Sequence, residues 1–145
     1  MKCFSTDEFG RIFVLRLDQR EFVLEKIKEL IEKEKIVNGV VVSGIGTIDM
    51  CTLHMVMYTS YPPIEHFETW KDQPLELSSI DGIIADGKPH LHCVVSDHQK
   101  AYSGHLEEGC RVLYLCEIVI AELKSLNLER LPNQHGIMGL EAKRN

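Results

Sequence analysis

Apolar and polar residues alternate over most of this sequence, and one segment near the N-terminus has a different period. Residues 12–17 are rich in apolar side chains, which predicts a first β-strand. Asp18 and Glu21 have the spacing of a capping box, and apolar side chains follow at helical intervals: Val23, Ile27, Leu30 and Ile31. We therefore predict an amphipathic helix over residues 19–34.

The remainder of the chain has patterns typical of β-strands. Residues 40–46 are a β-branched run that includes two glycines, and residues 47–58 alternate as a further strand. Residues 74–85 supply one or two strands, and residues 110–123 supply a long apolar strand. Residues 64–71 fit a turn of helix and an edge strand equally well.

The sequence has no internal repeat and no low-complexity linker that would divide it. One helix among about six to eight strands predicts an α+β fold: a single compact domain over residues 1–145, with a mixed, largely antiparallel sheet. Residues 126–139 are expected to be irregular. Residues 141–145 form a polar tail that we expect to be disordered.

A dense group of histidines follows the predicted central strands. Residues two apart on a strand point to the same side, so His90 and His92 share one face while Leu91, Cys93 and Val95 point to the other. Residues 97–100 are polar and predict a tight turn. A turn centred between residues 98 and 99 places His105 directly across from His92.

Three imidazoles in that register could meet at one metal ion, because opposed residues of an antiparallel pair have Cβ atoms about 4.5–5.5 Å apart. We predict a Zn²⁺ or similar divalent ion on His90, His92 and His105, with an open fourth position. His98 lies in the turn and Cys93 on the opposite face, so neither should be a ligand. The alternative is a set of surface or hydrogen-bonded histidines. Four of the seven histidines fall between residues 90 and 105, which favours the metal.

Two carboxylates stand in otherwise apolar predicted strands, at Glu76 and Glu117. A carboxylate in such a place needs a partner, which is a cation, a backbone N–H or the second nitrogen of a metal-bound histidine. We favour the interpretation that each carboxylate has a purely structural partner. The alternative is that one of them accepts a hydrogen bond from the second nitrogen of a metal-bound histidine. The sequence identifies no catalytic residue.

Charge and cysteine usage narrow the function classes. The net charge of −6 and the absence of a Lys/Arg block argue against broad attraction to nucleic acid. Five cysteines are an odd number without a Cys-x-x-Cys motif, and the first residues lack the apolar run of a signal peptide. We expect a cytoplasmic protein with reduced thiols and, since no run approaches 18 apolar residues, no membrane span.

Several segments resemble those of the plants and prokaryotes conserved (PPC) domain in its stand-alone prokaryotic form. The matching segments are residues 13–17, 40–46, 74–82, 87–92, 104–106 and 117–120, and they cover nearly the whole length. The most specific is Gly87-x-Pro89-His90-x-His92, followed by Gly104-His105-Leu106. Two departures are Gln19-Arg20, where the family often has a glycine turn, and Ser103, which replaces a frequent glycine.

The resemblance implies a homotrimer whose histidine cluster holds zinc or a similar ion. The arrangement is also similar to the three-histidine site of acetolactate decarboxylase, a relative by fold. These expectations favour a protein that binds or acts on a small metabolite through the metal, with enzymatic turnover left open.

Two alternatives remain. The family is commonly labelled DNA-binding or transcription-associated because plant members carry separate AT-hook segments, and this sequence has no Arg-Gly-Arg-Pro. In that case Lys88, Lys100 and Arg111 are the candidate contacts. The second alternative is a non-catalytic oligomerisation module, which predicts a metal site with no open position.

Overall fold

The structure is a computed structural model that describes residues 1–144. In that range it contains eight strands and one helix. Their bounds are β1 (Phe9–Asp18), α1 (Val23–Glu34), β2 (Gly39–Val56), β3 (Glu65–Ala85), β4 (Lys88–Ser96), β5 (Ala101–Leu106), β6 (Arg111–Leu123), β7 (Leu128–Pro132) and β8 (Met138–Ala142). The predicted α+β class, with a largely antiparallel sheet and one main helix, is confirmed.

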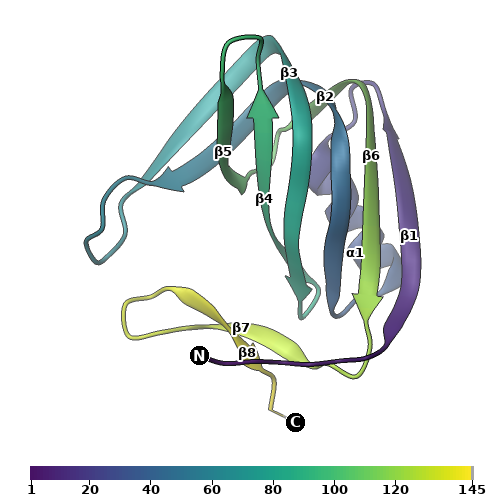
Figure 1. Ribbon diagram of the computed structural model, residues 1–145, viewed down its shortest axis with the longest axis vertical. Coiled ribbons are helices and arrows are strands. Elements are labelled where there is room, and N and C mark those ends of the chain that lie inside the picture. Colours follow the sequence, from purple (N-terminus) through teal and green to yellow (C-terminus); the bar gives the residue numbers. More distant parts are fainter. Residues whose placement is uncertain (145) are drawn as a thin grey trace.

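Six strands form one sheet in the order β1-β6-β2-β3-β4-β5, and every pairing in it is antiparallel. β5 also pairs with β2, so the sheet curls until its edge strand returns to its middle. Figure 1 shows α1 behind the sheet and the two-stranded β7–β8 hairpin below it. The sheet therefore has one face covered by the helix and one face turned toward the C-terminal hairpin.

The helix begins four residues later than the capping-box pattern predicted. Glu21 does accept a hydrogen bond from the Asp18 N–H at 2.8 Å. Arg20, however, has a positive φ of 73°, and its N–H donates to the Val112 carbonyl on β6. Phe22 is the N-cap and makes no side-chain cap. The Gln19-Arg20 segment is thus a turn that joins β1 to α1, and contacts with β6 override the local helix signal.

Two of the strands are longer than the sequence predicted. Residues 40–46 and 47–58 belong mainly to one bent strand, β2, whose pairing with β6 shifts register three times. Of residues 64–71, for which the sequence left two choices, residues 65–71 form the first part of β3. Register shifts of this kind bend a strand without ending it, and this explains why the glycines after residue 43 do not break β2.

The core lies between α1 and the inner face of the sheet. Helix residues Val23, Ile27 and Ile31 pack with β6 residues Ile118 and Ile120, and all are almost completely buried. On β4 the buried side chains Leu91, Cys93 and Val95 alternate with more exposed ones. His90 and His92 therefore lie on the face of the sheet that the helix does not cover, as the alternation predicted.

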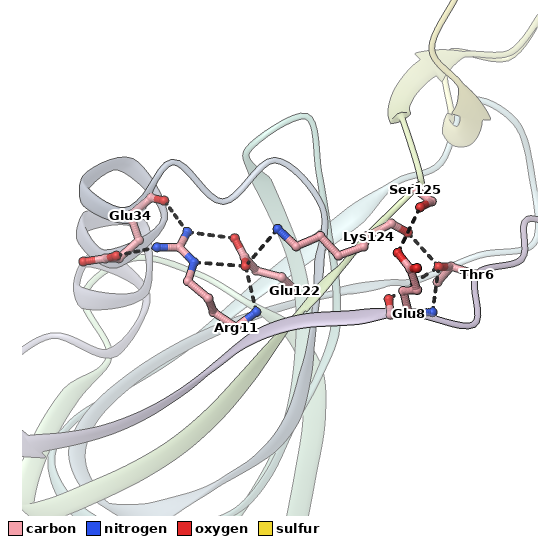
Figure 2. Close-up of polar contacts among 7 residues, drawn as sticks. All are labelled: Thr6, Glu8, Arg11, Glu34, Glu122, Lys124 and Ser125. Carbon is pink, nitrogen blue, oxygen red and sulfur yellow. Dashed lines mark hydrogen bonds and ion pairs between the residues drawn. The ribbon is translucent and has the colours of Figure 1, made fainter.

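An ion-pair network closes the edge of the sheet beside the helix (Figure 2). The Arg11 guanidinium on β1 donates to the Glu122 carboxylate on β6 at 2.8 Å and to the Glu34 carboxylate at 2.9 Å. It also donates to the Glu34 carbonyl at the end of α1, at 2.7 Å. Burial of the Glu122 side chain requires such a partner. The network therefore ties β1, β6 and the C-terminal end of α1 together.

The C-terminal segment is more regular than the sequence suggested. Residues 128–142 contain the β7–β8 hairpin, and buried Asn38 holds it by bonds to the Leu126 carbonyl and the Leu128 N–H. Glu141 and Ala142, which the sequence assigned to a polar tail, lie in β8. The last residue of that predicted tail, Asn145, lies outside the described residues. Between residues 1 and 144, no helix has the length and apolar character to cross a membrane.

Candidate metal centre

The register predicted for the histidine hairpin is confirmed. β4 and β5 pair with His92 directly opposite His105, and the turn between them is closed by the Asp97 N–H donating to the Lys100 carbonyl at 3.1 Å. The Asp97 carboxylate also accepts the backbone N–H groups of Gln99 and Lys100. This turn explains why a purely local pattern was sufficient to place the two strands.

A fourth histidine joins the group from a distant part of the chain. The return of β5 to β2 sets His105 opposite His54, with ring centroids 4.5 Å apart and nearly parallel planes. Gly104 permits this approach, because a Cβ added there would lie 2.7 Å from the His54 carbonyl oxygen. The glycine of the Gly104-His105-Leu106 segment therefore has a direct role in assembling the site.

The three predicted ligands surround one point. Ring centroids lie 5.5 Å apart for His90 and His92, 4.9 Å for His90 and His105, and 5.4 Å for His92 and His105. One ring nitrogen from each residue lies within 4.8 Å of the other two. A tetrahedral zinc with bonds of about 2.0–2.1 Å needs nitrogens roughly 3.4 Å apart. Small ring rotations supply that change, so the donor set fits a divalent ion.

Glu107 is the carboxylate that accompanies these histidines. Its Oε1 accepts a hydrogen bond from His54 Nδ1 at 2.6 Å and lies 3.9 Å from His105 Nε2. His54, His105 and Glu107 form a second group able to hold an ion, and it shares His105 with the first. Glu65 lies 3.8 Å from His54 Nε2 on the other side. His54, Glu65 and Glu107 were not among the site residues predicted from the sequence.

The structure does not bring the two predicted supporting carboxylates to the histidines. Glu76 is exposed on β3 opposite Thr47 and Ser96. Glu117 is exposed on β6 opposite Arg16 of β1. Neither lines the histidine cavity. The alternation of the strands places both carboxylates toward solvent, so no buried charge requires a partner there.

Burial favours neutral imidazoles at the centre of the group. It is the largest cause that lowers the pKa of His105 to about 4, and the nearby His54 and His90 act in the same direction against Glu107. Burial likewise lowers the pKa of His90, with the Arg130 charge as the next cause. Metal binding requires the deprotonated ring nitrogen. At neutral pH these two rings are already in the form that a metal ion accepts.

The histidines open into a cavity of about 520 Å³. Its walls come from β2, the start of β3, the β4–β5 hairpin and the C-terminal hairpin. The residues that line it are His54, Met55, Val56, Pro63, Glu65, Pro89, His90, His92, His105, Arg130, Gly136, Ile137 and Met138. A concave, largely apolar space with a few convergent polar groups is typical of small-molecule sites.

His98 and Cys93 lie away from the three converging histidines. His98 lies in the β4–β5 turn, where its ring contacts the Gln99 side chain. Cys93 is buried on the opposite face of β4. Both positions follow from the confirmed register.

Two of the three candidate DNA contacts lie far apart, and the third is paired with carboxylates. Lys88 begins β4 and Lys100 follows its other end, and a nine-residue strand separates its ends by roughly 26 Å. Arg111 is held by the Asp49 carboxylate through two bonds of 2.8 Å and by Asp72 at 3.3 Å. Its charge is therefore already compensated.

The fold and the cavity define this protein as a small antiparallel β domain with a histidine-lined candidate ligand site. A model of the Plants and Prokaryotes Conserved (PCC) domain matches residues 4–124. The chain belongs to the PCC domain family, for which the abbreviation PPC is also used.

Solved structures share this fold. A PPC protein of Pyrococcus horikoshii has a TM-score of 0.78 at 27% identity and covers 98% of this chain and 100% of its own. The metal-containing protein AF0104 of Archaeoglobus fulgidus has a TM-score of 0.78 at 24% identity, over 95% and 97% of the two chains. A candidate DNA-binding protein of Bacteroides thetaiotaomicron has a TM-score of 0.79 at 18% identity, over 94% and 98%.

A curated relative is the bifunctional protein GlmU of Synechococcus sp. (strain JA-3-3Ab), 25% identical over 124 residues and 85% of this chain. The match covers 19% of that relative and 18% of the GlmU of a second Synechococcus strain. The chain thus spans about a fifth of the length of the curated relatives it matches.

Proposed function

We propose that this protein binds one Zn²⁺ or similar divalent ion through His90, His92 and His105 and presents it to a small molecule in the adjoining cavity. The convergence of three ring nitrogens within 4.8 Å of one another is the observation that supports this most strongly. Imidazole donors suit zinc and its transition-metal neighbours, whereas calcium and magnesium prefer oxygen ligands. The Archaeoglobus protein of the same fold is described as metal-containing, which agrees with the proposal.

Different residues of the chain have different roles at the proposed site. The three histidines would hold the ion beside the cavity, where it would supply Lewis-acid chemistry. Glu107 accepts the Nδ1–H of His54 and so fixes the orientation of that ring beside His105. Met55, Val56 and Met138 give part of the cavity an apolar lining.

Metal content of single variants tests the proposal. The variants His90→Ala, His92→Ala and His105→Ala should each lose stoichiometric metal, measured by mass spectrometry after dialysis against zinc. His98→Ala is the matched control, since it removes a histidine from the turn of the same hairpin. Full metal content in the first three variants, or loss in the control alone, contradicts the proposal.

We further propose that the protein assembles as a homotrimer. Exposed apolar side chains on the sheet face turned away from α1 support assembly, and they include Ile12, Val14, Ile45 and Leu115. Isolated apolar residues on a surface are ordinary, but neighbouring strands that present several together are typical of interfaces. A reducing, cytoplasmic location agrees with five free cysteines, of which four are buried.

The DNA-binding alternative has less support in this chain. It rests on the description of fold relatives such as the Bacteroides protein. The oligomerisation alternative requires a metal site closed to ligands, whereas the histidine group borders a cavity of about 520 Å³.

A further inference from the structure

The cavity contains one cationic side chain that the metal proposal does not use, Arg130 of β7. Its guanidinium donates to the Ile83 carbonyl at 3.1 Å and, more weakly, to the Lys88 carbonyl at 3.4 Å. Both acceptors are main-chain oxygens on the two strands beside the histidines. The two bonds hold the guanidinium in place and use only part of its five N–H donors.

Arg130 has no acidic partner among residues 1–144, since none of their carboxylates lies within 4.0 Å of its guanidinium. By contrast, Arg11 forms an ion pair with Glu122, and Arg111 forms one with Asp49. Arg130 is also half-buried. A positive charge held partly out of water and without a counter-ion is unfavourable unless an anion binds beside it.

The position of Arg130 is close to the proposed metal ligands. Its Ile83 acceptor lies directly opposite His90 in the β3–β4 pairing. Opposed residues of an antiparallel pair lie about 5 Å apart, so the guanidinium is bonded to the immediate neighbour of a ligand histidine. Arg130 and His90 also line the same cavity. One small molecule can therefore reach Arg130 and the metal together.

We propose that the cavity binds a small carboxylic acid, with its carboxylate on the Arg130 guanidinium, a neighbouring oxygen on the metal ion and an apolar body against Ile137 and Met138. This inference rests on the proposed metal site. A planar guanidinium fork matches a carboxylate through two parallel hydrogen bonds. Glu65 on the same cavity wall opposes a multiply charged anion such as phosphate. With a divalent ion (+2), Arg130 (+1) and the carboxylates of Glu65 and Glu107 (−1 each), the site carries a net charge of +1, which one carboxylate balances.

Calorimetric titration tests the inference with two matched probes, 2-hydroxyisobutyrate and its uncharged amide. Zinc-loaded wild-type protein should bind the acid at least tenfold more tightly than the amide. Arg130→Met should lose at least tenfold in affinity for the acid, with unchanged zinc content and unchanged affinity for the amide. Arg130→Lys keeps the charge without the fork and should lose less. Arg16→Met, which removes an exposed arginine on β1, is the control and should bind as wild type does.

The outcomes separate this inference from the metal proposal. Zinc uptake with equal binding of acid and amide overturns the carboxylate subsite and leaves the metal site standing. Absence of zinc uptake overturns the metal proposal, and the acid–amide comparison on zinc-free protein then decides the role of Arg130. If Arg130→Met does not fold, the affinities of Arg130→Lys and wild type for the acid are compared instead. Equal affinities then overturn the carboxylate subsite. Inorganic phosphate that binds more tightly than the acid overturns the assignment to carboxylates.

Discussion

The imidazole rings of His54 and His105 stack with their centroids 4.5 Å apart, although β5 is an edge strand and β3 and β4 separate it from β2 in the sheet order. The contact exists because β5 pairs with β4 on one side and with β2 on the other. Glu107 lies just beyond β5 and accepts the His54 Nδ1–H at 2.6 Å. The histidine hairpin is therefore completed by β2, a strand that no local sequence pattern places beside it.

Glu107→Gln should weaken metal binding, because the variant removes the negative charge beside His105 and the strong acceptor of His54. Loss of such an outer carboxylate lowers metal affinity by about 10–100-fold. Glu117→Gln is the matched control, since Glu117 is exposed on β6 and does not line the cavity. Zinc affinities from competition with a chromogenic chelator measure the difference, and equal affinities in the two variants would show that Glu107 has no part in the site.

Gly104→Ala should separate β5 from β2. The added methyl would stand 2.7 Å from the His54 carbonyl oxygen and 3.2 Å from the Leu53 Cβ, so the strands must move apart. Overpacking of this kind costs about 1–3 kcal/mol. We expect a lower midpoint of thermal unfolding together with weaker zinc binding. Ser103→Ala, at the neighbouring exposed position, should change neither measurement.

The Arg11–Glu122 pair should give the protein a defined acid sensitivity. The Arg11 hydrogen bond is the largest cause that lowers the pKa of Glu122 from 4.5 to about 2. A carboxylate whose pKa is lower in the folded state stabilises the fold. The full contribution is present above about pH 4.5, and it disappears as the pH falls toward about 2. Glu122→Gln should lower the free energy of unfolding at pH 7 by about 1–3 kcal/mol, as expected for bonds to a charged group.

The same variant should lose less stability than wild type between pH 5 and pH 3 in urea titrations, because it lacks the titrating carboxylate. Asp18→Asn is a suitable control, since its partner Arg16 and its own side chain are both largely exposed. Parallel pH profiles for wild type and Glu122→Gln would contradict the assignment.

Val14→Lys should dissociate the proposed trimer. Val14 is 76% exposed in the single chain, so a charge there disturbs an interface and leaves the core intact. Light scattering should give about three times the chain mass of 16.6 kDa for wild type and the single-chain mass for the variant. A single-chain mass for wild type at micromolar concentration would overturn the proposed assembly.

Duplex DNA should not bind tightly to this chain. Each chain carries a net charge of −6, and assembly multiplies the charge that repels phosphate. Fluorescence anisotropy at physiological salt should give no sub-micromolar dissociation constant. A sub-micromolar value with a steep salt dependence would support the DNA-binding alternative, and loss of that binding in Lys100→Ala would locate the contact.

The hairpin of His90, His92 and His105 was predictable because its information is local. Alternation fixes the two faces of β4, and the polar turn fixes the partner of His92. The β6 strand was predictable for a similar reason, since its apolar run is long and uninterrupted by glycine or proline. The class of the fold followed from these elements and from the single amphipathic segment.

The remaining features depend on contacts between distant segments. Arg20 has a positive φ, and its N–H donates to the Val112 carbonyl. No pattern in the residues next to Arg20 predicts that long-range hydrogen bond. His54 was visible on one face of an alternating strand, but only the β2–β5 pairing makes it a neighbour of His105. Arg130 lies in a segment without clear periodicity, and its place in the cavity depends on the docking of β7 against Ile83.

The C-terminal hairpin separates the two proposed binding sites along the chain. The family model ends at residue 124, after the four histidines that line the cavity. Arg130, Ile137 and Met138 come from the segment beyond it. If the proposed sites are correct, exchange of one short terminal segment should change the ligand that the cavity prefers without changing the three histidines proposed to bind the ion. Relatives with the same histidines and different terminal hairpins should accordingly prefer different ligands.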